Sequence, residues 1–198
     1  MQSGVGGYDF AARPSLSALS QDVLWSTSAS SAVLALTHPN ILYAPLTHPP
    51  PAGLGDQRHS PEGVYALHRP SGVELLFLPG STPQSPLAAL IPMGDDALGH
   101  IEAATRFWRS WHGRPAVKDT RVTKQQRRRI RLMLQAADGR EHGASYREIA
   151  DAIFGSARVA TDPWKTSPLR DTVIGLVESA ITMIGGGYLQ LLRHRRRS

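Results

Sequence analysis

The chain has 198 residues, 41% of them hydrophobic, and a formal net charge of +6. This length can bury one larger core or two small ones, so we expect a folded protein. The absence of cysteine excludes disulfides, cysteine-ligated metal sites and a cysteine nucleophile, and it fits a reducing cytoplasm.

The first part of the chain predicts a flexible leader followed by a β-rich module. Residues 1–30 are rich in Gly, Ser and Ala and show little periodicity, which is typical of a flexible leader. The β-rich module spans residues 31–113. Within it, short β-favouring runs broken by proline and glycine predict strands at residues 33–36, 41–43, 64–67 and 73–78.

A turn and a helix complete this module. Arg69-Pro-Ser-Gly72 places proline where its fixed φ suits a turn, so we expect an antiparallel hairpin over residues 63–78. Residues 46–62 are dense in proline, histidine and glycine and predict a loop. A helix that closes near Gly113 is predicted by the helical spacing of Leu98, Ile101, Ala104, Trp108 and Trp111. We interpret its tryptophans as core residues, and residues 113–122 as the joint to the next domain.

Residues 121–192 predict an all-helical domain, so the expected fold class is α+β. Helix starts are marked by Thr123 with Gln126 and by Ser145 with Glu148, both capping boxes, and by Ser167 with Pro168, an N-cap and N1 pair. We expect the helices to end at Asp138-Gly139, at a left-handed Gly155, and at Gly185. Their predicted apolar faces are Ile130, Met133, Leu134 and Ala137; Tyr146, Ile149, Ala150, Ile153 and Phe154; and Leu169, Val173, Leu176, Val177, Ala180, Ile181 and Ile184.

Positive charge is concentrated in this helical part. Residues 121–198 hold 15 Lys and Arg against 7 Asp and Glu, a net charge of +8, whereas residues 1–120 hold 7 against 9, a net charge of −2. A basic domain attracts polyanions, and each neutralised phosphate releases counterions. The arginines of the basic tail, residues 193–198, are equally well interpreted as a solvated terminus that aids solubility.

The last two helices predict a helix-turn-helix, with double-stranded DNA as its partner. The start of the long helix is where a recognition helix meets base edges, and it carries Lys165, Thr166, Ser167 and Arg170. Arg147 lies on the polar face of the preceding helix and suits a backbone contact. Phosphate contacts are expected from Lys124, Arg127, Arg128, Arg129 and Arg131. Capped amphipathic helices also build ordinary bundles, so the pattern alone leaves that interpretation open.

An ordered set of short motifs resembles the RovC-like DNA-binding domain family of bacterial transcriptional regulators. The motifs run from Thr123-Lys-Gln-Gln-Arg-Arg-Arg-Ile-Arg-Leu through Gly143-Ala-Ser-Tyr-Arg-Glu-Ile-Ala, Ile153-Phe-Gly, Trp164-Lys-Thr-Ser and Leu169-Arg to Gly186-Gly-Tyr-Leu. The resemblance covers about residues 121–192. It implies a helix-turn-helix regulator, an activator of secretion-system or mobile-element genes, and it implies DNA contacts at Arg147, Lys165, Thr166, Ser167 and Arg170.

Two alternatives stay open. The chain departs from the family pattern at Val173-Ile174-Gly175, where relatives tend to carry arginine, so the outward face of the long helix is less basic. An exposed Ile174 or Met183 would suit a protein surface, as in the antiactivators that bind a related regulator and that the family also resembles. Gly175 costs about 1 kcal/mol relative to alanine and would mark close packing or a partner's approach.

An enzyme is the other alternative, and the residues do not favour it. The histidines lack metal-ligand spacing, and Asp95 with Asp96 precedes a helix, where carboxylates cap N–H groups. We expect no enzyme, no cofactor and no metal. RNA polymerase or a related regulator is a further expected partner, and the protein is expected to form a homo-oligomer. No segment predicts a secretion signal or a membrane span, so we expect a cytoplasmic protein without a membrane partner.

Overall fold

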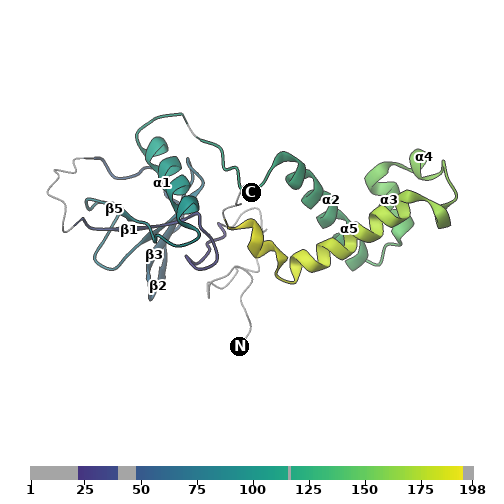
Figure 1. The fold of residues 1–198 in the computed structure, drawn as a ribbon, viewed down its shortest axis with the longest axis horizontal. Helices are drawn as coiled ribbons and strands as arrows, with labels where there is room; N and C mark the ends of the chain where they lie inside the picture. Colours follow the sequence, from purple (N-terminus) through teal and green to yellow (C-terminus); the bar gives the residue numbers. More distant parts are fainter. Residues whose placement is uncertain (1–21, 40–47, 116, 194–198) are drawn as a thin grey trace. The chain divides into compact units, whose positions relative to one another are not determined.

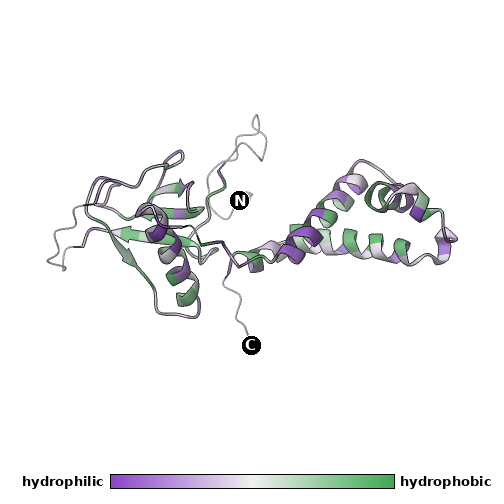
Figure 2. Cartoon of the chain, turned by 90° about the horizontal axis from the view of Figure 1, so that it is seen from above, coloured by the Kyte–Doolittle hydropathy of each residue, from purple (hydrophilic) through white to green (hydrophobic). Residues whose placement is uncertain are grey.

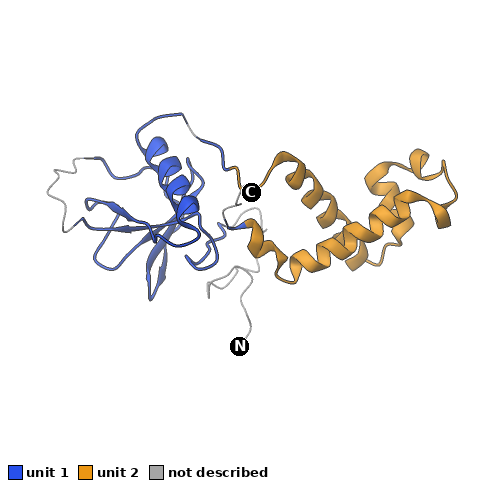
Figure 3. Cartoon of the chain, in the orientation of Figure 1, with its two compact units in different colours: residues 1–119, 192–198 blue, residues 120–191 orange. Residues whose placement is uncertain are grey.

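The computed structural model of the chain describes residues 22–39, 48–115 and 117–193. It divides into two compact units, residues 1–119 with 192–198 and residues 120–191 (Figure 3). For the described residues, Figure 1 shows the strands and α1 in the first unit and the remaining helices in the second. The predicted α+β class, with a β-rich N-terminal part followed by an all-helical part, is confirmed.

The first unit is built on a five-stranded sheet of order β2-β3-β4-β1-β5. The strands are β1 Val33–Thr37, β2 Arg58–Ser60, β3 Gly63–His68, β4 Val73–Phe77 and β5 Ala88–Leu90. The predicted β3–β4 hairpin is confirmed, and Gly72 takes the positive φ of 64° that its turn requires. The pairing of β1 with β4 is parallel, which no local signal predicts.

Two strands differ from the prediction. The edge strand β2 lies inside the predicted loop 46–62 and pairs with β3. The sequence did not predict this strand, because Arg58-His-Ser has no β-favouring apolar pattern. The other edge strand, β5, follows a proline-rich stretch and is antiparallel to β1. The predicted strand at residues 41–43 lies outside the described residues.

Both faces of the sheet are covered. On one face, α1 (Ala97–Trp111) packs Ala103 and Phe107 against Leu34 and Leu75. On the other face, Leu24 packs against the far side of β3 and β4. Residues 22–30 therefore belong to the folded unit, and the Trp25 N–H donates to the Glu74 carboxylate at 2.6 Å. The predicted leader is wrong for residues 22–30, because apolar contacts hold this segment in place, while residues 1–21 lie outside the described residues.

The apolar residues that predicted α1 are only partly buried, because Ala104 and Trp111 pack against the core of the sheet and the other three are exposed. The helix turns His100, Ala103 and Phe107 toward the sheet, and the His100 ring makes a hydrogen bond of 3.2 Å with the Val33 carbonyl. Trp108, which the sequence interpretation placed in the core, is 45% exposed, and Leu98 and Ile101 are 62% and 41% exposed. Packing against the sheet, rather than the helix's own apolar period, decides which face is buried.

The segment after α1 folds back along it. Buried Arg106 pairs with Asp119 at 2.8 Å, and the Arg109 Nε–H donates to the Pro115 carbonyl at 3.0 Å. The division between the units falls between residues 119 and 120, inside the predicted joint 113–122.

The second unit contains α2 Lys124–Glu141, α3 Tyr146–Phe154, α4 Ser156–Val159, η2 Trp164–Thr166, α5 Pro168–Ile184 and η3 Gly187–Leu191. Both capping boxes and the Ser167 N-cap are present, so the three predicted helix starts are confirmed. The predicted end of α2 at Asp138-Gly139 is wrong. The helix continues to Glu141, and the absence of a side chain at Gly139 leaves room for the Ile149 side chain of α3 to approach closely.

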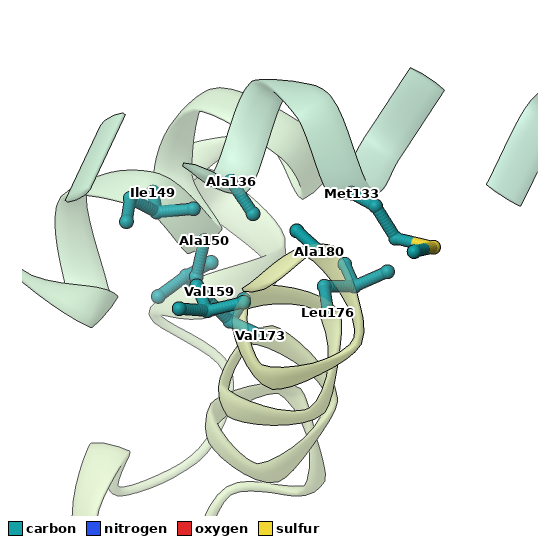
Figure 4. Packing of buried hydrophobic residues seen from close by; sticks show 9 residues of the cluster. Met133, Ala136, Ile149, Ala150, Val159, Val173, Leu176 and Ala180 are labelled. Atoms are coloured by element: carbon teal, nitrogen blue, oxygen red, sulfur yellow. The ribbon is translucent and has the colours of Figure 1, made fainter. Parts of the chain in front are cut away.

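The core of this unit joins α2, α3, α4 and α5. Figure 4 shows Met133 and Ala136 of α2 facing Val173, Leu176 and Ala180 of α5. Val177 of α5 also belongs to the cluster, and α3 and α4 complete it with Ile149, Ala150 and Val159. Three residues of the predicted apolar faces are instead exposed, and these are Leu134, Ile181 and Ile184. The core covers only part of each long helix, so the sequence period overstates what is buried.

Candidate nucleic-acid interface

Four cations line one face of α2. Arg127, Arg128 and Arg131 lie three, four and seven residues after Lys124, which places all four on the same side of a helix, and all are exposed. The buried residues of α2, Met133 and Ala136, lie on its other side. In Figure 2 the helical part of the chain carries both hydrophilic and hydrophobic segments. We call these four residues the α2 basic face.

Helix energetics disfavour this arrangement. The first turn of α2 carries no acidic residue, and no carboxylate occurs between residues 121 and 137. Cations near a helix N-terminus oppose the macrodipole, and like charges four apart, such as Lys124 with Arg128, destabilise a helix by a few tenths of a kcal/mol per pair. The Thr123 capping box, worth about 1 kcal/mol, offsets part of this cost. Stability therefore gives no reason for the charge cluster, whereas binding of an anion does.

Arg129 points away from the α2 basic face. Its Nη2 donates to the Ser179 hydroxyl of α5 at 3.4 Å. This bond also shows that the first half of α2 lies beside the second half of α5, so the two helices run antiparallel. Arg129 is the natural control for its neighbours on the same helix.

The second group of predicted contacts surrounds the start of α5. Lys165 and Thr166 are exposed on η2, and the Thr166 hydroxyl donates to the Pro163 carbonyl. Arg170 is partly exposed, with its guanidinium 3.5 Å from the Asp171 carboxylate. Ser167 differs from these three, because it is only 2% exposed and its hydroxyl accepts the Leu169 N–H. The structure gives Ser167 a capping role that withdraws it from solvent.

The outward face of α5 is acidic rather than basic. Asp171 and Glu178 are exposed on it, and an added Cβ at Gly175 would meet nothing within 4 Å. Close packing at Gly175 within the described chain is therefore excluded. Val173, grouped with this face in the sequence, is fully buried. Any groove contact by α5 is consequently limited to its first turn and η2.

The connection between α3 and α5 is longer than expected. A helix-turn-helix has a turn of about three to four residues, whereas residues 155–167 separate these helices and contain α4 and η2. Gly155 has φ 88° and ψ 138°, so its φ is positive but its ψ is extended. The chain continues from Gly155 directly into α4, a helix that the sequence did not predict.

Arg147 is exposed in the first turn of α3. A carboxylate already occupies this helix N-terminus, because the Ser145 N–H donates to Glu148 at 2.7 Å. This backbone hydrogen bond, helped by the Ser145 hydroxyl, lowers the pKa of Glu148 below its usual value. Arg147 is thus an exposed cation beside a helix end that already holds a carboxylate.

The predicted contacts thus form separate groups. The α2 basic face lies beside the C-terminal half of α5, whereas Lys165, Thr166 and Arg170 lie at the N-terminal end of α5, as Figure 1 shows for α2 and α5. A 17-residue helix is about 25 Å long, so the groups are separated by most of that distance. A duplex could meet both groups only along an extended surface.

Among the described residues, no group of three or more His, Asp or Glu side chains could hold a metal ion. Asp96 is the N-cap of α1, but its side chain makes no capping hydrogen bond, contrary to the sequence interpretation. Within the described ranges, no helix has the length and apolar content needed to cross a membrane.

Residues 90–193 match the family described as the T6SS transcription factor DNA-binding domain, RovC_DNA-bd. The matched region covers more than half of the chain. The chain belongs to this family. The RovC_DNA-bd match begins at Leu90, in β5, so it takes in α1 as well as the helical unit, whereas the motifs recognised in the sequence begin only at residue 121. No curated protein matches the chain. Membership establishes a DNA-binding domain of transcription factors.

Proposed function

We propose that this chain is a sequence-specific, DNA-binding transcriptional regulator of the cytoplasm that activates T6SS or mobile-element genes. The observation that carries this proposal is the α2 basic face, four exposed cations on the side of the helix opposite the core. Its cations stand where helix energetics would place acidic residues, and a phosphate backbone would compensate their mutual repulsion. The RovC_DNA-bd match supports the same function.

The two groups of residues have different roles in this proposal. The α2 basic face and Arg147 contact phosphates and position the protein, without reading sequence. Lys165, Thr166 and Arg170 reach base edges from η2 and the first turn of α5, where Lys165 and Thr166 are exposed and Arg170 is partly exposed. Ser167 supports them by capping α5.

A salt titration with matched variants tests the phosphate role. The full chain is first used to select its preferred duplex from a random pool, and affinity is then measured over a range of salt concentrations. Arg128→Gln should weaken selected and random DNA alike and reduce the salt slope by about 0.9 for one lost phosphate contact. Arg129→Gln, on the next residue but bonded to Ser179, should leave the slope unchanged. Equal slopes for Arg128→Gln and the unmodified chain would contradict the proposal.

The groove role predicts a different pattern. Lys165→Ala and Arg170→Ala should each cost on the order of 1–3 kcal/mol on the selected duplex and much less on random DNA. Identical losses on both DNAs for these changes and for Arg128→Gln would remove the assignment of η2 and α5 to base reading.

A second candidate function has its own observation. The helical unit exposes Leu134, Ile181 and Ile184, large apolar side chains that suit a protein contact. An antiactivator that binds a related regulator would use such residues, and so would a homo-oligomer or a contact with RNA polymerase. Two results together would favour the antiactivator. The chain would bind a related regulator with an affinity that is insensitive to salt and is lost in Ile181→Asn, and it would select no duplex from the random pool.

A further inference from the structure

The first unit leaves an apolar stripe of α1 uncovered. Leu98, Ile101 and Trp108 follow one another at helical spacing, and none is buried in the described structure. Scattered exposed apolar residues need no explanation, but a run of large ones along one helix face marks a binding surface. The RovC_DNA-bd match includes this helix without assigning it any role.

A cavity of about 350 Å³ lies beside the second half of this stripe, between α1 and the β1–β5 side of the sheet. Its walls include Leu34 and Leu36 from β1, Ala89 from β5, and Ala104, Trp108 and Trp111 from α1. Two small side chains create the space. Alanines 89 and 104 stand on opposite walls, and neither fills the gap between helix and sheet.

The aromatic walls are held in place by contacts with neighbouring groups. The Trp111 indole N–H donates to the Pro49 carbonyl at 2.9 Å, and its ring stacks on Phe107 with centroids 5.3 Å apart. The Trp108 ring stacks on His112 at 4.4 Å, with the Arg114 guanidinium 5.0 Å from its centroid. Two indoles are thus positioned before any ligand arrives, which lowers the entropy cost of binding.

The chemistry of the lining is almost entirely carbon. None of the described residues that line the cavity is charged. The Trp111 N–H is already used, and the Thr105 hydroxyl donates to the Ile101 carbonyl at 2.8 Å, so the hydroxyl oxygen can still accept one hydrogen bond. A charged ligand would lose its hydration here without gaining a partner. A neutral aromatic ligand would lose little and would gain ring contacts.

We propose that this cavity binds a small, neutral, mainly aromatic molecule with at most one hydrogen-bond donor, directed at Thr105. The volume is at the lower end of the range for small-molecule sites, about 300–1,000 Å³, and the lining has the expected apolar and aromatic character. The first unit is then a ligand-binding module, a role separate from the DNA contacts of the second unit.

The test uses N-phenyl-1-naphthylamine, a neutral aromatic probe whose fluorescence rises in apolar sites, and the full chain. The probe should bind saturably with one site per chain and quench tryptophan emission, because Trp108 and Trp111 form the wall. The anionic probe 8-anilinonaphthalene-1-sulfonate, similar in size, should bind at least about tenfold more weakly, a difference of about 1.4 kcal/mol. Non-saturable binding, or equal affinity for the two probes, would overturn the proposal.

Matched variants locate the probe. Ala89→Phe fills the cavity and should lower affinity for the neutral probe about tenfold or more, whereas Ala88→Phe places the same bulk on the opposite face of β5 and should not. Ala104→Phe fills the cavity from α1, and it is the cavity-filling variant to use if the β5 variants unfold. Ile181→Asn removes an exposed apolar residue of the second unit and should leave binding unchanged. Equal losses of probe affinity in the Ala88 and Ala89 variants, or a loss of probe affinity in Ile181→Asn, would overturn the assignment. Saturable binding of a protein partner, with no saturable binding of the probe, would overturn it too.

Discussion

Two helical glycines provide an internal comparison of packing. Gly139 lies in α2 and Gly175 in α5, and replacing a glycine inside a helix with alanine gains about 0.8–1.0 kcal/mol of helix propensity. A Cβ at Gly175 meets nothing within 4 Å, so Gly175→Ala should stabilise the protein by nearly that amount. A Cβ at Gly139 would lie 2.9 Å from Cγ1 and 3.3 Å from Cδ1 of Ile149.

Ile149 cannot move aside easily, because it is buried in the helical core. Overpacking a core costs about 1–3 kcal/mol, so the net effect of Gly139→Ala should range from about zero to a loss of about 2 kcal/mol. The difference between the two variants, about 1–3 kcal/mol, does not depend on helix propensity, because that gain is common to both.

Urea unfolding followed by far-ultraviolet circular dichroism measures this difference. A double-mutant cycle with Ile149→Ala should restore the full propensity gain at Gly139, since that change removes the two atoms the new Cβ would meet. Equal stabilisation by Gly139→Ala and Gly175→Ala would refute the close approach of α2 and α3. Gly175→Ala should also leave DNA affinity unchanged, because the proposed contacts end at the first turn of α5.

Three further predictions concern a cap and two titrating groups. Ser167→Ala should lower the free energy of unfolding by about 0.5–2 kcal/mol through loss of the α5 cap, while DNA affinity per folded molecule stays constant; a loss of affinity without a loss of stability would make Ser167 a contact. The lowered pKa of Glu148 means that the charged form is favoured in the folded state, so protection of α3 amides from hydrogen exchange should be present above the usual glutamate pKa and fall as the pH drops through the folded value. Glu148→Gln should abolish that pH dependence, and an unchanged dependence would contradict the prediction. Burial lowers the pKa of His68, so the unfolded chain binds the proton more readily, and stability against urea should decrease as the pH falls below the usual histidine pKa. His68→Gln should flatten this decrease, and a curve identical to that of the unmodified chain would assign it to other groups.

The local signals in the sequence determined the helix starts, one hairpin and the α2 basic face. A capping box needs only residues such as Ser145 and Glu148, three positions apart, and the turn before Gly72 needs only its own four residues. The spacing of Lys124 and its neighbours on α2 likewise follows from the helix period alone. These features depend on contacts within a few residues, so the sequence alone is enough to predict them.

Tertiary structure decided which faces are buried and where elements separated in sequence meet. It paired β1 with β4 in parallel, turned Phe107 rather than Trp108 toward the sheet, and carried α2 through Gly139. It also withdrew Ser167 from solvent and left Ile181 exposed. Each of these outcomes depends on a partner surface far away in the sequence, and an apolar residue is buried only where such a surface covers it. For this reason the sequence by itself determined the charged helix face of this protein, but only the tertiary structure decided the cavity beside Trp108 and Trp111.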